Sequence, residues 1–125
     1  MRILLDSHAL LWWMGDPAKL TPTARAAIAN PENEVFASAV SIWEIGLKRS
    51  KGKLVIPDNF ADFLPENGIT SLPFSAAHAQ ASVLLPTIHG DPFDRALIAQ
   101  CQLESLTFAT RDAVMADYNI AVLDV

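Results

Sequence analysis

Short apolar runs alternate with amphipathic segments along most of this chain, and this alternation constrains its fold more than any other feature. Runs of about four residues have the length of a buried β-strand, whereas apolar residues spaced three or four apart indicate a helix. Strands separated by helices pair in parallel, because a crossover helix returns the chain to the same edge of the sheet. We therefore expect an α/β protein, a three-layer α/β/α sandwich with a mainly parallel central sheet. The expected strands are 2–5, 34–37, 69–72, 106–109 and 120–123.

Capping residues indicate where several helices begin. Thr21 can act as an N-cap with Pro22 at the first helical position, and Asp91 with Pro92 repeats this arrangement. The residue before a proline avoids the α region, so the helix after Thr21 should end near Asn30. The expected helices are 8–14, 21–30, 38–49, 58–64, 75–85, 91–105 and 112–118.

Length and composition indicate one compact domain over residues 1–125, since 51% of the residues are hydrophobic and a chain of this size can bury one core. The single Cys101 excludes an internal disulfide and fits a buried thiol. Asp6 interrupts the first apolar run too early for a signal peptide, and no segment has the ~18 uninterrupted apolar residues of a membrane helix. We expect a cytoplasmic protein with no membrane partner.

The net charge of −5 makes the chain a poor generic binder of phosphate backbones. However, a site built from carboxylates contributes negative charge by itself, and a bound metal ion would offset it. The charge is therefore compatible with a nucleic-acid substrate, provided that the basic contact surface is local or comes from a partner subunit. The one dense basic run is Lys48, Arg49, Lys51 and Lys53, which also fits a solvated loop.

Two acidic residues follow expected strands directly. Asp6 ends the first run, and Asp112 follows the fourth. In parallel sheets, functional sites lie beyond the carboxyl ends of the strands, so both residues should lie at the edge where chemistry occurs. Each also has an ordinary explanation, since Asp6 could be an N-cap and Thr110 could cap the short helix that contains Asp112.

Two further acids lie on expected helices. Glu44 could complete a capping box with Ser41 or pair with Lys48 four residues later. Against these roles, Glu44 falls on an apolar stripe that should face the core, where a carboxylate needs a compensating cation. Asp94 likewise continues the inward stripe of its helix, while Asp91 fits the N-cap. The apolar stripes are Val40, Trp43 and Leu47 for Glu44, and Leu97, Ile98, Cys101 and Ser105 for Asp94.

Histidines and tryptophans carry weaker signals. The three histidines are too dispersed to form a metal triad, although His89 could contact phosphate at the rim of a cleft. Trp12 and Trp13 are adjacent, so at most one can point fully into the core. The other would then lie at the surface, where exposed aromatic residues often mark a protein interface.

Taken in order, these motifs resemble the PIN-domain ribonucleases, and in particular the VapC-type toxins of bacterial type II toxin–antitoxin systems. The resemblance covers the whole chain, and its most specific part is the segment from Asp91 to Ala99. The motifs that carry it are the strand followed by Asp6-Ser7, Ser41-Ile-Trp-Glu44, Asp91-Pro-Phe-Asp94-Arg-Ala-Leu-Ile-Ala, and Thr110-Arg-Asp112.

The resemblance implies an endoribonuclease that depends on Mg²⁺ or Mn²⁺. By position, Asp6, Glu44 and Asp94 match the three core acids of the family, Asp112 matches the fourth, and Thr110 is its hydroxyl neighbour at the substrate. We expect Asp6 and Asp94 to be direct metal ligands, because Mg²⁺ keeps several waters and needs only one or two carboxylates. Carboxylate-held Mg²⁺ neutralises charge on the reacting phosphate. The implied partners are an RNA substrate, a second copy in a homodimer, and a VapB-type antitoxin that places a basic side chain in the acidic pocket.

Alternative functions share parts of this pattern. A PIN-like module that binds RNA or protein without cutting would carry the same acids, and a nuclease for DNA would use the same metal chemistry. A receiver-type phosphoacceptor needs an additional acidic pair after the first strand and a lysine after a late strand, and this chain has neither. A haloacid-dehalogenase-like phosphatase needs an acid where His8 stands. No motif indicates which RNA would be cut.

Overall fold

The structure is a computed structural model that describes residues 1–125, and its centre is a fully parallel sheet. The sheet order is β3-β2-β1-β4-β5, so the chain builds outward from β1 in one direction and then returns to its other side. The sheet confirms the predicted α/β class, and each expected strand appears within two residues of its predicted bounds. The strands are β1 (Arg2–Leu5), β2 (Glu34–Ser38), β3 (Thr70–Leu72), β4 (Thr107–Thr110) and β5 (Val122–Asp124).

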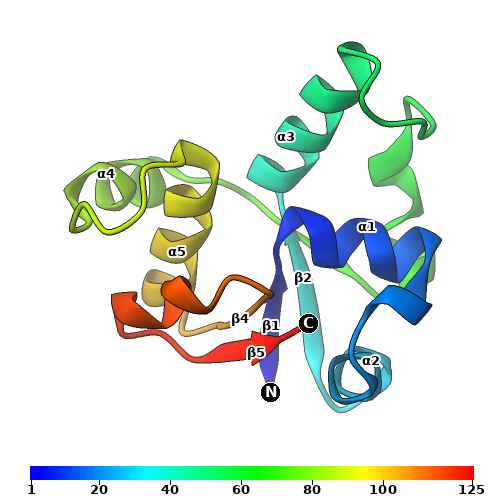
Figure 1. Cartoon of the computed structure of the whole chain (residues 1–125), viewed down its shortest axis with the longest axis horizontal. Coiled ribbons are helices and arrows are strands. Elements are labelled where there is room, and N and C mark those ends of the chain that lie inside the picture. The colour runs from blue at the N-terminus through cyan, green and yellow to red at the C-terminus, as the bar shows by residue number, and fades with distance from the viewer.

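Helices cover both faces of this sheet, as Figure 1 shows, with α1 and α2 on one side and α4 and α5 on the other. The predicted caps at Thr21 and Asp91 are present at the starts of α2 and α5, and Ser75 likewise accepts a hydrogen bond at the start of α4. None of the helices combines the length and apolar character that crossing a bilayer demands. The helices are α1 (Ser7–Gly15), α2 (Pro22–Ala29), α3 (Ala39–Ser50), α4 (Ala76–Leu84) and α5 (Pro92–Glu104).

Strand β1 supplies both hydrophobic cores. Ile3 and Leu5 pack into the core under α1 and α2, whereas Leu4 packs into the core under α5. Successive side chains of a strand point to opposite faces, so a continuous apolar run fits a strand that is covered on both sides. This alternation explains why β1 lies at the centre of the sheet.

Two predicted helices take a different form. The segment 58–64 contains a 3₁₀ helix at Phe60–Phe63 followed by another at Pro65–Asn67, and no side chain caps the first. Pro65 has no N–H to donate to the Ala61 carbonyl, so one continuous α-helix cannot form, although the backbone of Leu64 is in the α region. The segment after Asp112 is likewise a 3₁₀ helix, Ala113–Tyr118.

Helix α3 corrects two predictions about Glu44. Its N-cap is Ser38, so the predicted capping box from Ser41 does not form. Its buried positions are Val40, Ser41 and Ile45, whereas the side chain of Trp43 is 62% exposed, so the stripe that we predicted to face inward mainly faces solvent. The helix lies across the ends of the strands and contacts both cores, and for this reason apolar residues occur on more than one of its faces.

Candidate active site

The acidic residues gather at the carboxyl ends of the central strands, at the point where the order of the strands reverses. Strand β1 pairs with β2 on one side and with β4 on the other, and Asp6 and Thr110 end these two adjacent strands. The Asp6 N–H donates to the Ala109 carbonyl at 3.0 Å, which fixes the two strand ends side by side. This is the switch point of a parallel sheet, the position where ligands bind in such folds.

Asp6 performs both roles that the sequence allowed, since it caps α1 and also takes part in the acidic site. Its Oδ1 accepts a hydrogen bond of 2.7 Å from the Ala9 N–H and so caps α1. Burial raises the pKa of Asp6, while the Ala9 N–H and the Thr110 hydroxyl favour the ionised form and Glu44 disfavours it. A nearby cation stabilises the ionised form of a carboxylate that burial has desolvated.

Asp94 occupies the first turn of α5, and Asp91 performs the capping. The Asp91 Oδ1 accepts from the N–H groups of Phe93 and Asp94 at 2.8 and 3.3 Å, so the predicted N-cap is confirmed. Burial raises the pKa of Asp94 to about 6, the charges of Asp91, Glu44 and Asp6 add to the rise, and His89 opposes it. Asp94 therefore interacts electrostatically with the other acids across the site.

Three of the four predicted acids line a single hollow of about 440 Å³. They reach it from three separate elements, the end of β1, the start of α5 and the loop after β4. Of the seven lining residues only one is hydrophobic, so the hollow suits a charged ligand rather than an apolar one. The lining residues are Asp6, His8, Trp12, Asp94, Thr110, Arg111 and Asp112.

Glu44 lies beside this hollow rather than in its lining. It accepts a hydrogen bond from the Ser7 hydroxyl, and its other oxygen lies 3.7 Å from the Lys48 ammonium, the predicted i, i+4 pair. Its charge is still felt at Asp6 and Asp94. Glu44 can thus act on the hollow electrostatically, and Ser7 separates it from direct contact.

Thr110 at the end of β4 and Asp112 just after it also line the hollow. The Thr110 hydroxyl accepts from the Asp112 N–H at 3.2 Å, and Asp112 itself caps the 3₁₀ helix through the Val114 N–H. The second oxygen of Asp112 faces the His89 Nε2 at 3.5 Å, and the same nitrogen lies 3.4 Å from Asp94 Oδ2. This histidine bridge was not predicted, and its only sequence signal was the position of His89 two residues before the Asp91 cap.

The donor set fits a hard cation, although it is not a closed chelate. No group of three or more His, Cys, Asp or Glu side chains stands close enough to form a complete metal cluster. Asp6 and Asp94 nevertheless offer desolvated carboxylate oxygens on one hollow, which suits an ion such as Mg²⁺ that retains several waters. The predicted convergence is therefore a shared hollow and not a preformed cage.

Trp12 and Arg111 form a wall that sequence reasoning did not assign to the site. The Arg111 guanidinium stacks over the Trp12 ring at 4.3 Å and donates hydrogen bonds to the carbonyls of Lys19 and Val125. Trp13 instead points away and donates to the Asn67 carbonyl at 3.0 Å. The wall therefore places a fixed positive charge and an aromatic face beside the carboxylates.

A parallel α/β sheet with an acidic hollow at its switch point defines the class of this chain, and sequence comparison identifies the family. Residues 3–121 match the PIN domain family, and the chain belongs to that family. Among individual relatives, it is 32% identical over 117 residues to Ribonuclease VapC22 of Mycobacterium tuberculosis, covering 88% of this chain and 86% of that protein. The predicted family is therefore confirmed.

Solved structures of low sequence identity share the fold. VapBC2 from Rickettsia felis, bound to a promoter DNA fragment, superposes with a TM-score of 0.74 at 16% identity over 98% of each chain. DNA-bound VapBC from Salmonella typhimurium gives 0.72 at 12% identity over 99% of this chain and 98% of that one. FitAcB from Neisseria gonorrhoeae gives 0.64 at 23% identity over 98% and 96%. These likenesses support the three-layer architecture.

Proposed function

We propose that this chain is a metal-dependent endoribonuclease that acts as the toxin of a toxin–antitoxin pair. The observation that carries the proposal is the hollow in which Asp6, Asp94 and Asp112 meet at the switch point of a PIN-domain fold. The ribonuclease relative of 32% identity supports the same chemistry. RNA hydrolysis needs this kind of site, because negative charge accumulates on the phosphate and on the leaving oxygen.

Asp6 and Asp94 would hold Mg²⁺ or Mn²⁺ in this proposal. Once bound, the cation would supply the positive charge that the reacting phosphate needs and would orient it for attack. Burial disfavours the ionised form of both carboxylates in the metal-free protein. A bound cation would stabilise that form, and the carboxylates have already lost part of their hydration before it binds.

The remaining polar groups would position substrate and water. Asp112 and Thr110 line the same hollow, where they can orient the attacking water and the phosphate. Arg111 adds a fixed guanidinium at the rim, which suits a phosphate of the RNA backbone. Glu44, held by Ser7 and Lys48, would act from behind the lining through its charge.

The test is RNA cleavage by the purified chain with Mn²⁺ or Mg²⁺, read by mapping the new RNA ends. Asp94→Asn should abolish the cuts, whereas Asp117→Asn, which changes an exposed acid on the 3₁₀ helix after β4, should leave them. Cleavage by Asp94→Asn at the parent's rate would exclude the assignment. A DNA substrate in the same assay separates an RNA-directed from a DNA-directed enzyme.

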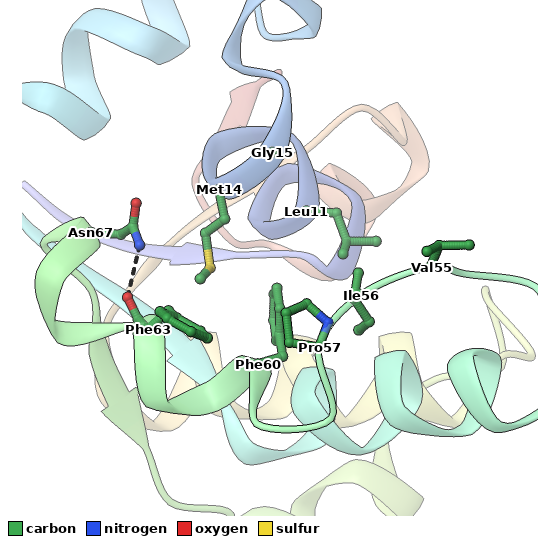
Figure 2. Close-up of a pocket in the computed structure, with 9 residues that line it drawn as sticks. All are labelled: Leu11, Met14, Gly15, Val55, Ile56, Pro57, Phe60, Phe63 and Asn67. Atoms are coloured by element: carbon green, nitrogen blue, oxygen red, sulfur yellow. Dashed lines mark hydrogen bonds between the residues drawn. The ribbon is translucent and has the colours of Figure 1, made fainter.

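An antitoxin partner is the second part of the proposal. Besides the acidic hollow, the structure has an apolar groove of about 400 Å³, shown in Figure 2, where Leu11 and Met14 of α1 face Ile56 and Phe60. A similar fold, with a TM-score of 0.63 at 17% identity, is solved as a toxin–antitoxin complex from Klebsiella pneumoniae. We infer that an apolar segment of a VapB-type antitoxin occupies this groove. The full lining is Leu11, Met14, Gly15, Val55, Ile56, Pro57, Phe60, Phe63 and Asn67.

Helix α1 separates the groove from the acidic hollow. Leu11 and Met14 line the groove, whereas Trp12 lines the hollow. A partner segment that crosses α1 could therefore bury apolar side chains in the groove and place a basic side chain near the acids. A homodimer and a cytoplasmic location belong to the same proposal. Co-purification with the product of a neighbouring small gene tests the partner.

The alternative function is a PIN-like module that binds RNA or protein without cutting. It is favoured by the open arrangement of the acids, which do not form a metal cluster without a ligand. Binding of RNA with no new RNA ends at saturating Mn²⁺ would support this alternative.

A further inference from the structure

Hydrogen bonds from both its backbone and its ring hold His89 in place. Its backbone N–H donates to the Tyr118 hydroxyl at 2.6 Å, and its ring Nδ1 accepts from the Asp91 N–H at 3.0 Å. The Tyr118 hydroxyl in turn donates to the Pro86 carbonyl at 3.2 Å, so the loop is fixed to the 3₁₀ helix after β4. The position and the orientation of the ring are both determined before any ligand is present.

The same contacts determine which ring nitrogen carries the proton. Because the Asp91 N–H donates to Nδ1, Nδ1 must be an acceptor, and the neutral ring carries its hydrogen on Nε2. Nε2 lies between two carboxylate oxygens, 3.4 Å from Asp94 and 3.5 Å from Asp112. The Nε2–H of the neutral ring therefore lies near both acids, and Nε2 cannot ligate a metal without giving up the Asp91 bond.

Arg95 frames the loop that carries this histidine. Its guanidinium donates to four backbone carbonyls between α4 and α5, including that of His89 at 3.2 Å. These bonds give Arg95, which belongs to the Asp91-to-Ala99 segment, a structural role that the sequence had not indicated. The other three carbonyls belong to Ser82, Leu85 and Pro86.

The two acids that His89 joins come from different elements. Asp94 belongs to α5, Asp112 follows β4, and no other side chain is ion-paired with both of them. A group that contacts each of two ligating or water-orienting carboxylates sets their separation and the direction of their free oxygens, as outer-shell partners do in metal sites.

We propose that His89 is a positioning residue, which uses its Nε2–H to hold Asp94 and Asp112 at the spacing that the cation site requires. The proposal rests on the proposed metal-dependent function and extends it to a residue outside the set of acids. Asp91, Arg95 and Tyr118 build the frame, and His89 transmits their geometry to the two carboxylates.

The test compares two amide substitutions by Mn²⁺ calorimetry on the full chain without RNA. His89→Asn can keep the acceptor for the Asp91 N–H but does not reach the acids, whereas His89→Gln places an amide N–H near the position of Nε2. His89→Asn should weaken Mn²⁺ binding by about 10–100-fold, and His89→Gln should recover most of that loss. Tyr118→Phe, which removes one bond of the frame, should weaken binding in the same direction but less.

Each result decides the proposal. Unchanged or tighter Mn²⁺ binding by His89→Asn would overturn it, even if the melting temperature falls, because His89 would then be a structural residue or a competitor of the cation. Equal losses in His89→Asn and His89→Gln would overturn the role of the Nε2–H. If the parent chain binds no Mn²⁺, the proposed metal-dependent function fails together with this inference, whereas a binding parent with an unaffected Asn variant refutes the inference alone.

Discussion

The acidic hollow and the apolar groove are lined by different residues of α1, and neither is an arrangement that folding stability by itself would favour. The hollow brings carboxylates together in a partly buried place, where burial opposes their charge. The groove leaves Phe63 and Val55 exposed although both could gain by burial. A cation would therefore stabilise the hollow, whereas an apolar partner would stabilise the groove.

The strongest way to separate the two sites is Asp6→Asn. Asparagine is as good an N-cap as aspartate, so the Ala9 bond and α1 should persist. RNA cleavage should fall by about 10³-fold, since several kcal/mol of charge stabilisation depend on a metal ligand. In contrast, the metal-free melting temperature should stay equal or rise, because the substitution removes a desolvated charge. Cleavage assays and thermal unfolding in a chelator measure the two effects, and a lower stability with full activity would contradict both.

The groove is tested by Phe63→Asp, which places a charge on its exposed wall. Binding of the copurifying antitoxin should weaken by about 1–2 kcal/mol, roughly five- to thirtyfold in Kd, while RNA cleavage by the free chain should be unaffected. Leu103→Asp is the matched control, because Leu103 is a similarly exposed apolar residue on the outer surface of α5. Equal losses for the two variants would show that the groove is not the docking surface.

The smallest expected effect is a pH dependence that belongs to the hollow alone. The folded pKa of Asp94 is about 6, above its ordinary value of 3.8, so the folded chain binds more protons than the unfolded chain between these values. Metal-free stability should therefore fall as pH rises through this window and remain lower above it. Asp94→Asn should lose less stability than the parent between about pH 5 and about pH 7.5, and Mn²⁺ should stabilise the parent more at the higher pH. Thermal unfolding at both values, with and without Mn²⁺, measures this; parallel curves for the two proteins would contradict it.

The sequence predicted those parts of the site that follow from topology. Asp6 and Asp112 end neighbouring strands of a parallel sheet, so their shared edge needs only the strand pattern and the rule for switch points. Asp94 was found because it continues the stripe of α5 that contains the buried Leu97 and Ile98. These positions depend on local signals, and local signals can be read from one chain.

Positions that depend on contacts between distant segments were not predicted correctly. The Trp43 ring packs edge-on against Phe93 at 5.0 Å and leaves its other face to solvent, so the orientation of α3 depends on α5 and not on its own periodicity. The place of His89 depends on Tyr118, 29 residues away in the chain. No window of sequence contains either relationship.

The cap at Asp6 has one more consequence. Helix α1 starts on the same carboxylate that faces the hollow, and its side chains at Leu11 and Met14 form one wall of the groove. If a protein bound in the groove rotates this nine-residue helix slightly, the direction of the Asp6 carboxylate changes, although the protein does not contact Asp6. Occupancy of the two sites should then be thermodynamically coupled, and the coupling must be reciprocal, so that Mn²⁺ changes the affinity for the antitoxin by the same factor as the antitoxin changes the affinity for Mn²⁺.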